Sequence, residues 1–147
     1  MAAPPLTGIH HLTAVSGDVR GNREFYEGVL GLRLVKRTVN QDDPSAYHLF
    51  YADALGSPGT DITFFEWPLP PERRGGHSVT RTAFRVADAT VLAAWERRLA
   101  EAGVETTPFE AGARAEIRFE EPEGQRLAIV VDGGAGDQPA IWDGSPV

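Results

Sequence analysis

The sequence predicts an α+β fold of two βαβββ modules, each with one strand, one helix and three further strands. The signals for strands and helices follow the same order in both halves of the 147-residue chain. When the halves are aligned, Asp18 falls on Asp88 before the helix, and Gly59 falls on Gly124 at the closing hairpin. Because one helix covers only one face of a sheet, we expect the two copies to form a curved mixed sheet, a half-barrel lined by both.

The first module is predicted over residues 1–68. Alternation indicates a strand over 9–16, and Asp18 is a candidate N-cap for a helix over 20–30. Gly31 follows the last apolar residue of that helix, as C-terminal glycines do. Three strands are then expected at 32–39, 47–52 and 61–67, because turn-forming residues separate these runs.

The second module is predicted over residues 77–132, after a Pro- and Gly-containing linker. Asp88 is the second candidate N-cap, between a strand over 80–87 and a helix over 90–102. Further strands are expected at 104–108, 114–120 and 126–131. Residues 133–147 are rich in Gly and Pro and are expected to form a C-terminal tail or connector.

Composition limits the class of partner. The formal net charge is −7 and the basic residues are scattered, so nucleic acid is an unsuitable partner. No apolar run is long enough for a membrane span, and no signal segment is recognised at the start. The chain has no cysteine, which excludes disulfides and thiolate ligands. We therefore expect a cytoplasmic protein that binds neither nucleic acid nor a membrane.

Several short motifs resemble a known family. They are GIHHLT at 8–13, VLGLRLVKRTVN at 29–40, YHLFY at 47–51, GSPGT at 56–60 and TFF at 63–65. Together with the duplicated βαβββ pattern, they resemble the vicinal oxygen chelate superfamily of glyoxalases, bleomycin-resistance proteins and extradiol dioxygenases. Within it, they look most like the N-terminal half of the hydroquinone-type ring-cleaving dioxygenases.

The resemblance implies an architecture larger than this chain. Those dioxygenases are about twice as long and hold one mononuclear iron(II) or manganese(II). Residues 141–147 resemble the family's connector into its second half. The expected partners are therefore a small aromatic substrate and either a second copy, giving a homodimer, or a missing C-terminal half.

The resemblance also assigns candidate site residues. It implies that His11 is a metal ligand and that His10 and Thr13 lie near the substrate. The family's metal is held by two His and one carboxylate, which leaves positions open for substrate oxygens and O2. Because neighbours on a strand alternate, we expect His11 to face the cleft and His10 to face another direction.

The ligand positions of a complete two-module site correspond to His11, Thr63, Arg81 and Ala128. Only His11 is a good ligand, because Arg81 has no lone pair to offer and Ala128 has no donor atom. The chain alone is thus expected to have an incomplete metal site, with no cofactor of its own as one outcome.

Two functions remain open from the sequence. The first is a ring-cleaving dioxygenase, as an N-terminal half or a short form, acting on hydroquinone- or catechol-like aromatics. The alternative is a metal-free small-molecule binding module of the bleomycin-resistance type. For His48, Glu66 and His77 we favour structural or surface roles over ligand or acid–base roles.

Overall fold

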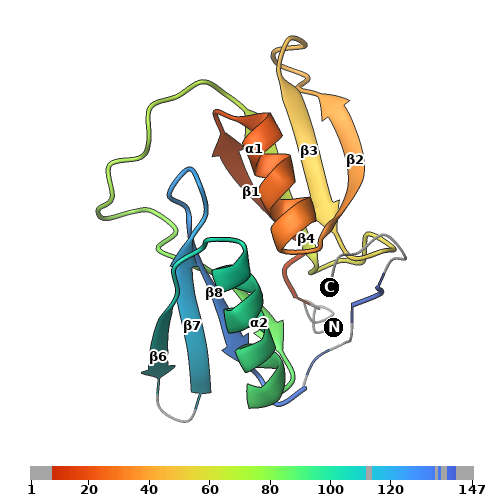
Figure 1. Ribbon diagram of the computed structural model, residues 1–147. Coiled ribbons are helices and arrows are strands. Elements are labelled where there is room, and N and C mark those ends of the chain that lie inside the picture. Colours follow the sequence, from red (N-terminus) through yellow and green to blue (C-terminus); the bar gives the residue numbers. More distant parts are fainter. Residues whose placement is uncertain (1–7, 112–113, 135, 137–138, 142–147) are drawn as a thin grey trace, which may run out of the picture. The chain divides into compact units, whose positions relative to one another are not determined.

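The structure is a computed structural model that describes residues 8–111, 114–134, 136 and 139–141 (Figure 1). The described residues form two compact units, one of residues 8–68 with 139–141 and one of residues 69–136. Each unit contains one four-stranded mixed sheet, with strand orders β1-β4-β3-β2 and β5-β8-β7-β6. The predicted α+β fold with two βαβββ modules is confirmed.

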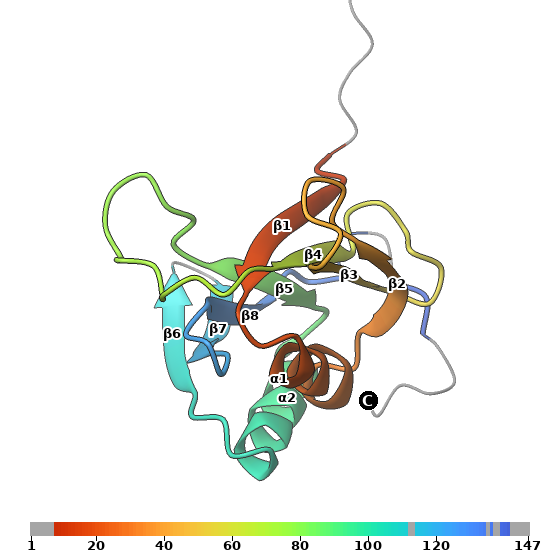
Figure 2. The same ribbon diagram turned by 90° about the horizontal axis from the view of Figure 1, so that it is seen from above.

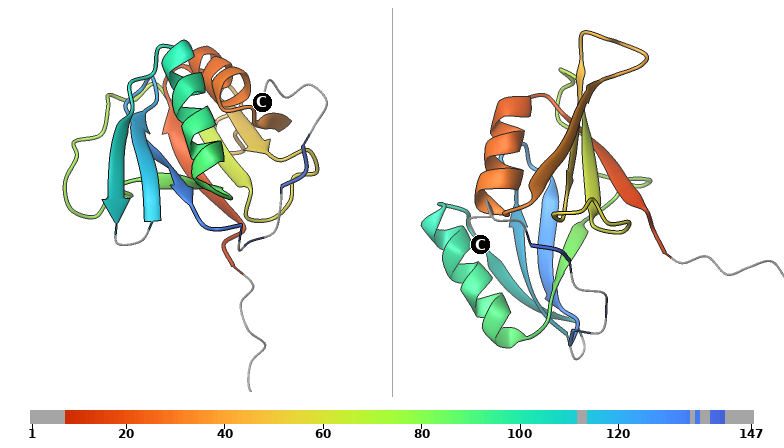
Figure 3. Two further views of the ribbon diagram at one scale, coloured as in Figure 1. Left: turned by 60° about the horizontal axis from the view of Figure 1, so that its bottom comes forward. Right: turned by 90° about the vertical axis from the view of Figure 1, so that its right-hand side faces the viewer.

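The first unit places its two terminal strands side by side. Its elements are β1 (His11–Ser16), α1 (Val19–Arg23), a π-helical continuation η1 (Glu24–Val29), β2 (Arg33–Val39), β3 (Tyr47–Ala52) and β4 (Asp61–Glu66). Strand β1 runs parallel to β4, and β3 is antiparallel to both β4 and β2. The helix therefore acts as part of the crossover that a parallel pair requires, and it covers one face of the sheet (Figures 1 and 3).

The helix of the first unit begins at the predicted cap. The Asp18 carboxylate accepts a hydrogen bond from the Gly21 amide at 3.0 Å. Further along, Tyr26 is fully buried and packs on Phe64 and Tyr51, with ring centroids 4.7 and 5.4 Å away. These aromatic rings form the core between the helix and the sheet.

The second unit repeats this plan. Its elements are β5 (Thr82–Val86), α2 (Ala89–Glu101), β6 (Thr107–Ala111), β7 (Arg114–Glu120) and β8 (Arg126–Val131). Asp88 caps α2 by accepting from the amides of Thr90 and Val91. Leu92 and Leu99 of this helix are buried in a core that includes Ile117, Leu127 and Ile129.

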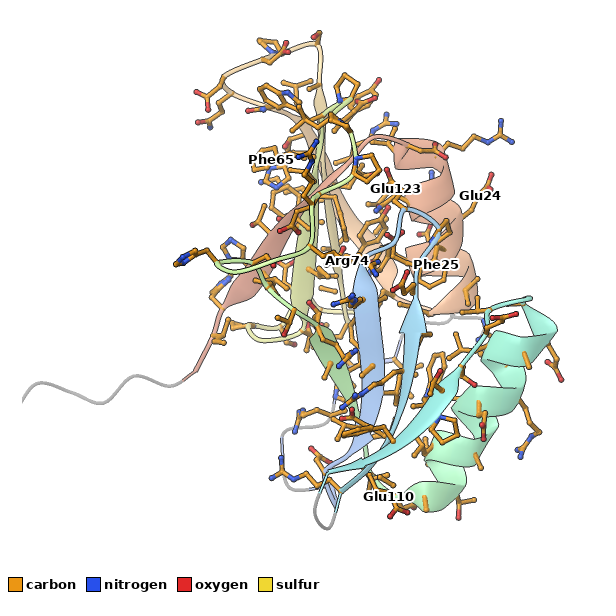
Figure 4. The ribbon with its side chains drawn as sticks, turned by 90° about the vertical axis from the view of Figure 1, so that its left-hand side faces the viewer. Glu24, Phe25, Phe65, Arg74, Glu110 and Glu123 are labelled. Atoms are coloured by element: carbon orange, nitrogen blue, oxygen red, sulfur yellow. The ribbon has the colours of Figure 1, made fainter. Side chains whose placement is uncertain are left out.

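A long loop without helix or strand joins β4 to β5 (Figure 2). Arg74 in this loop is held by the β7–β8 hairpin, as Figure 4 shows. Its guanidinium donates to the Gly124 carbonyl at 2.7 Å and pairs with Glu120 at 2.8 Å. The loop is thereby anchored to the second unit.

The strand registers support the internal repeat. Thr13 pairs with Thr63 in the first sheet, and Ala83 pairs with Ala128 in the second. The sequence alignment of the two halves places Thr13 on Ala83 and Thr63 on Ala128, so the two pairs occupy equivalent positions.

One strand prediction was displaced. The strand expected at 104–108 lies at Thr107–Ala111, because the residues that follow the end of α2 at Glu101 still bond back to its last turn, with the Val104 amide donating to the Leu99 carbonyl at 2.8 Å. Pro108 then falls inside β6 rather than ending it. A proline is tolerated there because β6 is an edge strand.

Among the residues that the structure describes, no helix is long and apolar enough to span a membrane.

Candidate functional site

The first sheet carries the predicted site residues on the face opposite its helix. His11 pairs with Asp61 and Thr13 with Thr63, while Thr63 and Phe65 pair with Phe50 and His48 of β3. Since alternate residues of paired strands share a face, these side chains lie together. We call this set the histidine face: His11, Thr13, His48, Phe50, Asp61, Thr63 and Phe65. Figure 4 shows Phe65 on this side of the sheet and Phe25 on the helix side.

His10 and His11 do not diverge as expected from strand alternation. Their Nδ1 atoms lie 3.1 Å apart, and their rings meet edge to face with centroids 5.2 Å apart. The reason is that β1 begins at His11, so His10 lies outside the regular strand. The alternation rule does not apply to it, and the two imidazoles form a contacting pair.

Thr13 belongs to a chain of side-chain hydrogen bonds. The Thr63 hydroxyl donates to the Thr13 oxygen at 2.9 Å, and His48 Nε2 lies 3.1 Å from the same Thr63 oxygen. Thr63 is fully buried, whereas Thr13 is exposed. The chain therefore connects a half-buried histidine to an exposed hydroxyl on the strand that carries His11.

Burial and neighbouring charge shift two ionisable groups of the histidine face. Partial burial lowers the pKa of His48, and the nearby positive charge of His11 adds to this effect. Burial raises the pKa of Asp61, while His11, His10 and His48 oppose that rise. One oxygen of Asp61 is buried without a hydrogen-bond partner among the described residues. Asp61 is thus a carboxylate whose ionisation is coupled to all three histidines.

The sequence alone did not identify Asp61 or the hydrogen-bond chain through Thr63 as parts of the site. A signal was available, because Asp61 and Thr63 alternate along β4 as His11 and Thr13 do along β1, and the two strands pair in that register. What could not be seen was that His48, on a third strand, bonds to the same hydroxyl.

The other predicted side chains serve the local structure. Glu66 accepts a hydrogen bond from the Tyr47 amide at 2.9 Å and so closes the end of the sheet. His77 lies exposed in the β4–β5 loop with a φ of 69°. Ala128 is fully buried on β8, and Arg81 precedes β5 with its Nε buried.

A metal centre of two His and one carboxylate needs three such side chains close together. His11 offers one imidazole, but residues 8–111, 114–134, 136 and 139–141 contain no group of three or more His, Cys, Asp or Glu able to hold a metal ion. The described residues by themselves do not fit a complete centre.

Comparisons with known proteins place this arrangement in context. The family model of the Glyoxalase/Bleomycin resistance protein/Dioxygenase superfamily matches residues 8–129. Two relatives from Bacillus subtilis, MhqA and MhqO, have names that provisionally assign them as ring-cleaving dioxygenases. They are 42% and 43% identical to this chain over 86% and 84% of its length. The chlorohydroquinone/hydroquinone 1,2-dioxygenase of Sphingobium indicum is 31% identical over 79% of the chain.

The fold is also similar to solved structures. A Bacillus subtilis protein provisionally named a dioxygenase superposes with a TM-score of 0.85 at 40% identity, covering 98% of this chain and 47% of its own. A glyoxalase-type domain from Frankia sp. EAN1pec superposes with a TM-score of 0.72 at 19% identity, which supports the fold alone; the match covers 86% of this chain and 98% of that one. The chain spans only 41%, 39% and 37% of the lengths of MhqA, MhqO and the Sphingobium enzyme.

Proposed function

Because the chain belongs to the Glyoxalase/Bleomycin resistance protein/Dioxygenase superfamily, we propose that it is part of a ring-cleaving dioxygenase. The substrate would be a hydroquinone- or catechol-like aromatic, and the metal a mononuclear iron(II) or manganese(II). One observation carries the proposal. The histidine face brings His11 and Thr13 to neighbouring exposed positions of β1, in a chain 42% identical to a relative named for ring cleavage.

The His10–His11 contact is compatible with His11 as the ligand. One Nδ1 must donate to the other, so the two rings adopt opposite tautomers. If His11 donates, its Nε2 lone pair is left for a metal, which is the usual arrangement of a ligating histidine with a supporting acceptor. His10 would then carry its proton on Nε2 and could donate it to a substrate oxygen.

The remaining ligands would come from outside the described residues. When bound, the metal would bring substrate oxygen and O2 together and act as the redox centre. The chain's own residues bind and orient: His11 holds the metal, while His10 and Thr13 position the substrate. A second copy or a further half would complete the site.

Oxygen uptake with hydroquinone tests the proposal in the native assembly. With iron(II) or manganese(II) supplied, we expect uptake that His11→Ala abolishes and Thr13→Val reduces. His77→Ala is the matched control, because His77 is an exposed loop histidine, and it should leave uptake unchanged. Absence of uptake with either metal in the wild-type protein would contradict the proposal.

A metal-free binding module of the bleomycin-resistance type is the second candidate. The observation that favours it is the lack of a three-ligand cluster in the part of the chain that the structure describes. Under this alternative, hydroquinone would bind without added metal and remain chemically intact. Calorimetry in the presence of a chelator separates the two functions.

A further inference from the structure

His48 lies at the inner end of the hydrogen-bond chain that reaches Thr13. Resting on the proposed function, we propose that His48 is a positioning residue. Through Thr63, it fixes the Thr13 hydroxyl as a hydrogen-bond donor toward an oxygen atom of the bound ligand. His48 itself does not reach the ligand in this scheme.

The direction of the Thr63–Thr13 hydrogen bond sets the polarity of the hydrogen-bond chain. Thr63 has a single hydroxyl proton, and it is donated to the Thr13 oxygen at 2.9 Å. The Thr63 oxygen can then only accept from His48, whose Nε2 is 3.1 Å away. His48 must therefore carry a proton on Nε2.

Packing keeps the His48 ring in this orientation. The ring stacks on Phe65 and lies tilted against Phe50, with centroid separations of 3.8 and 4.0 Å. Such a stack resists rotation of the imidazole and holds Nε2 against Thr63. Partial burial also favours the neutral ring, as the lowered pKa of His48 indicates.

The Thr13 hydroxyl, at the outer end of the hydrogen-bond chain, is then a hydrogen-bond donor. Thr13 uses its oxygen to accept from Thr63, so its own proton points to another acceptor. Thr13 is exposed and shares a strand face with His11. A ligand beside it would meet a donor, which suits a phenolic, phenolate or carbonyl oxygen. Without the relay, the Thr13 proton could turn inward to Thr63.

Ring-nitrogen NMR on the metal-free full chain tests the polarity. We expect His48 as the Nε2–H tautomer, with a ring proton protected from solvent exchange. Thr63→Val removes the acceptor at nearly constant volume and should speed that exchange by about tenfold, because the protecting hydrogen bond is lost. Thr63→Ser keeps the hydroxyl and should preserve the protection. An Nδ1–H tautomer, or equal exchange in both variants, would overturn the inference.

Kinetics in the native assembly tests the positioning role. His48→Phe keeps an aromatic ring but loses the donor, whereas His48→Gln retains an N–H near the position of Nε2. The Phe variant should lower kcat/KM for hydroquinone about tenfold, and the Gln variant should restore most of it. Adding Thr13→Val to His48→Phe should cost little beyond Thr13→Val alone, because both changes act on one hydroxyl.

Independent, additive losses in that double variant would show that His48 acts by another route and would refute the positioning role. If no variant and no wild-type assembly cleaves hydroquinone, the proposed function fails. The tautomer and exchange measurements still decide the polarity of the relay in that case. Amide NMR spectra of β3 and β4 confirm that each variant is folded.

Discussion

At the scale of single residues, Asp53 shows how one carboxylate ties distant segments together. It is 6% exposed, and its oxygens accept from the amides of Leu55, Ser57 and Ala140 at 2.9–3.1 Å. Although burial by itself would raise its pKa, these backbone donors outweigh it and lower the pKa of Asp53 to about 2. The ionised side chain therefore stabilises the fold.

The lowered pKa of Asp53 determines how its contribution to the free energy of unfolding changes with pH. The folded pKa lies below the ordinary value of 3.8, so the contribution is complete above about pH 5 and is lost as the pH falls toward 2. Its size is roughly 2 kcal/mol at neutral pH. We predict that Asp53→Asn lowers the free energy of unfolding in urea at pH 7 by about this amount and flattens its decline toward pH 3.

Asp42→Asn is the control for this change. Asp42 is an exposed turn residue, and its substitution should leave both the stability and its pH dependence close to wild type. A decline toward pH 3 that is equally steep in Asp53→Asn would show that other carboxylates govern acid unfolding.

Contacts between single residues far apart in the sequence were the hardest features to predict. Asp18 and Asp88 could be predicted as caps because an N-cap bonds to amides only two or three positions ahead of it. Asp53 and Ala140 are far apart in the sequence, and no local pattern predicts that contact. The same is true of His48 and Thr13, which meet only through a residue on a third strand.

At the scale of elements, α2 depends on its N-cap. The Asp88 carboxylate satisfies two amides of the first turn, at 2.8 and 2.9 Å. We predict that Asp88→Ala lowers the free energy of unfolding by about 1 kcal/mol. Asp88→Asn keeps a side-chain acceptor and should lose less than half of that. Equal stability of the Ala variant and the wild type in urea would count against the cap.

Strand and helix identities were largely accessible from the sequence because the hydrophobic pattern repeats. Strands β3, β7 and β8 begin and end at the predicted residues. The misplaced strand, β6, is an edge strand with a weak alternation signal, and Pro108 is a residue that favours a strand end over a strand interior. The bounds of edge strands are therefore the hardest to predict from the local sequence.

At the scale of the whole molecule, the proposed function needs further metal ligands from a second copy or a further half. The chain spans 41% of the length of MhqA, and the described residues contain no group of three or more possible metal ligands. We therefore predict association into a dimer or larger assembly. Sedimentation velocity at high micromolar concentration should show it, and a monomer under those conditions would contradict this prediction.

Paramagnetic broadening by manganese(II), followed at the histidine ring signals and at the side-chain signals of Thr13 and the glutamates, tests whether His11 is the metal ligand. Broadening detects even a weak site with a single protein ligand. We predict that His11 broadens first, with His10 and Thr13 next, and that His11→Gln removes the effect while His77 stays sharp throughout. Broadening centred on His48, on His77 or on the carboxylates of residues 120–123, and unchanged in His11→Gln, would contradict the assignment of His11 as the metal ligand.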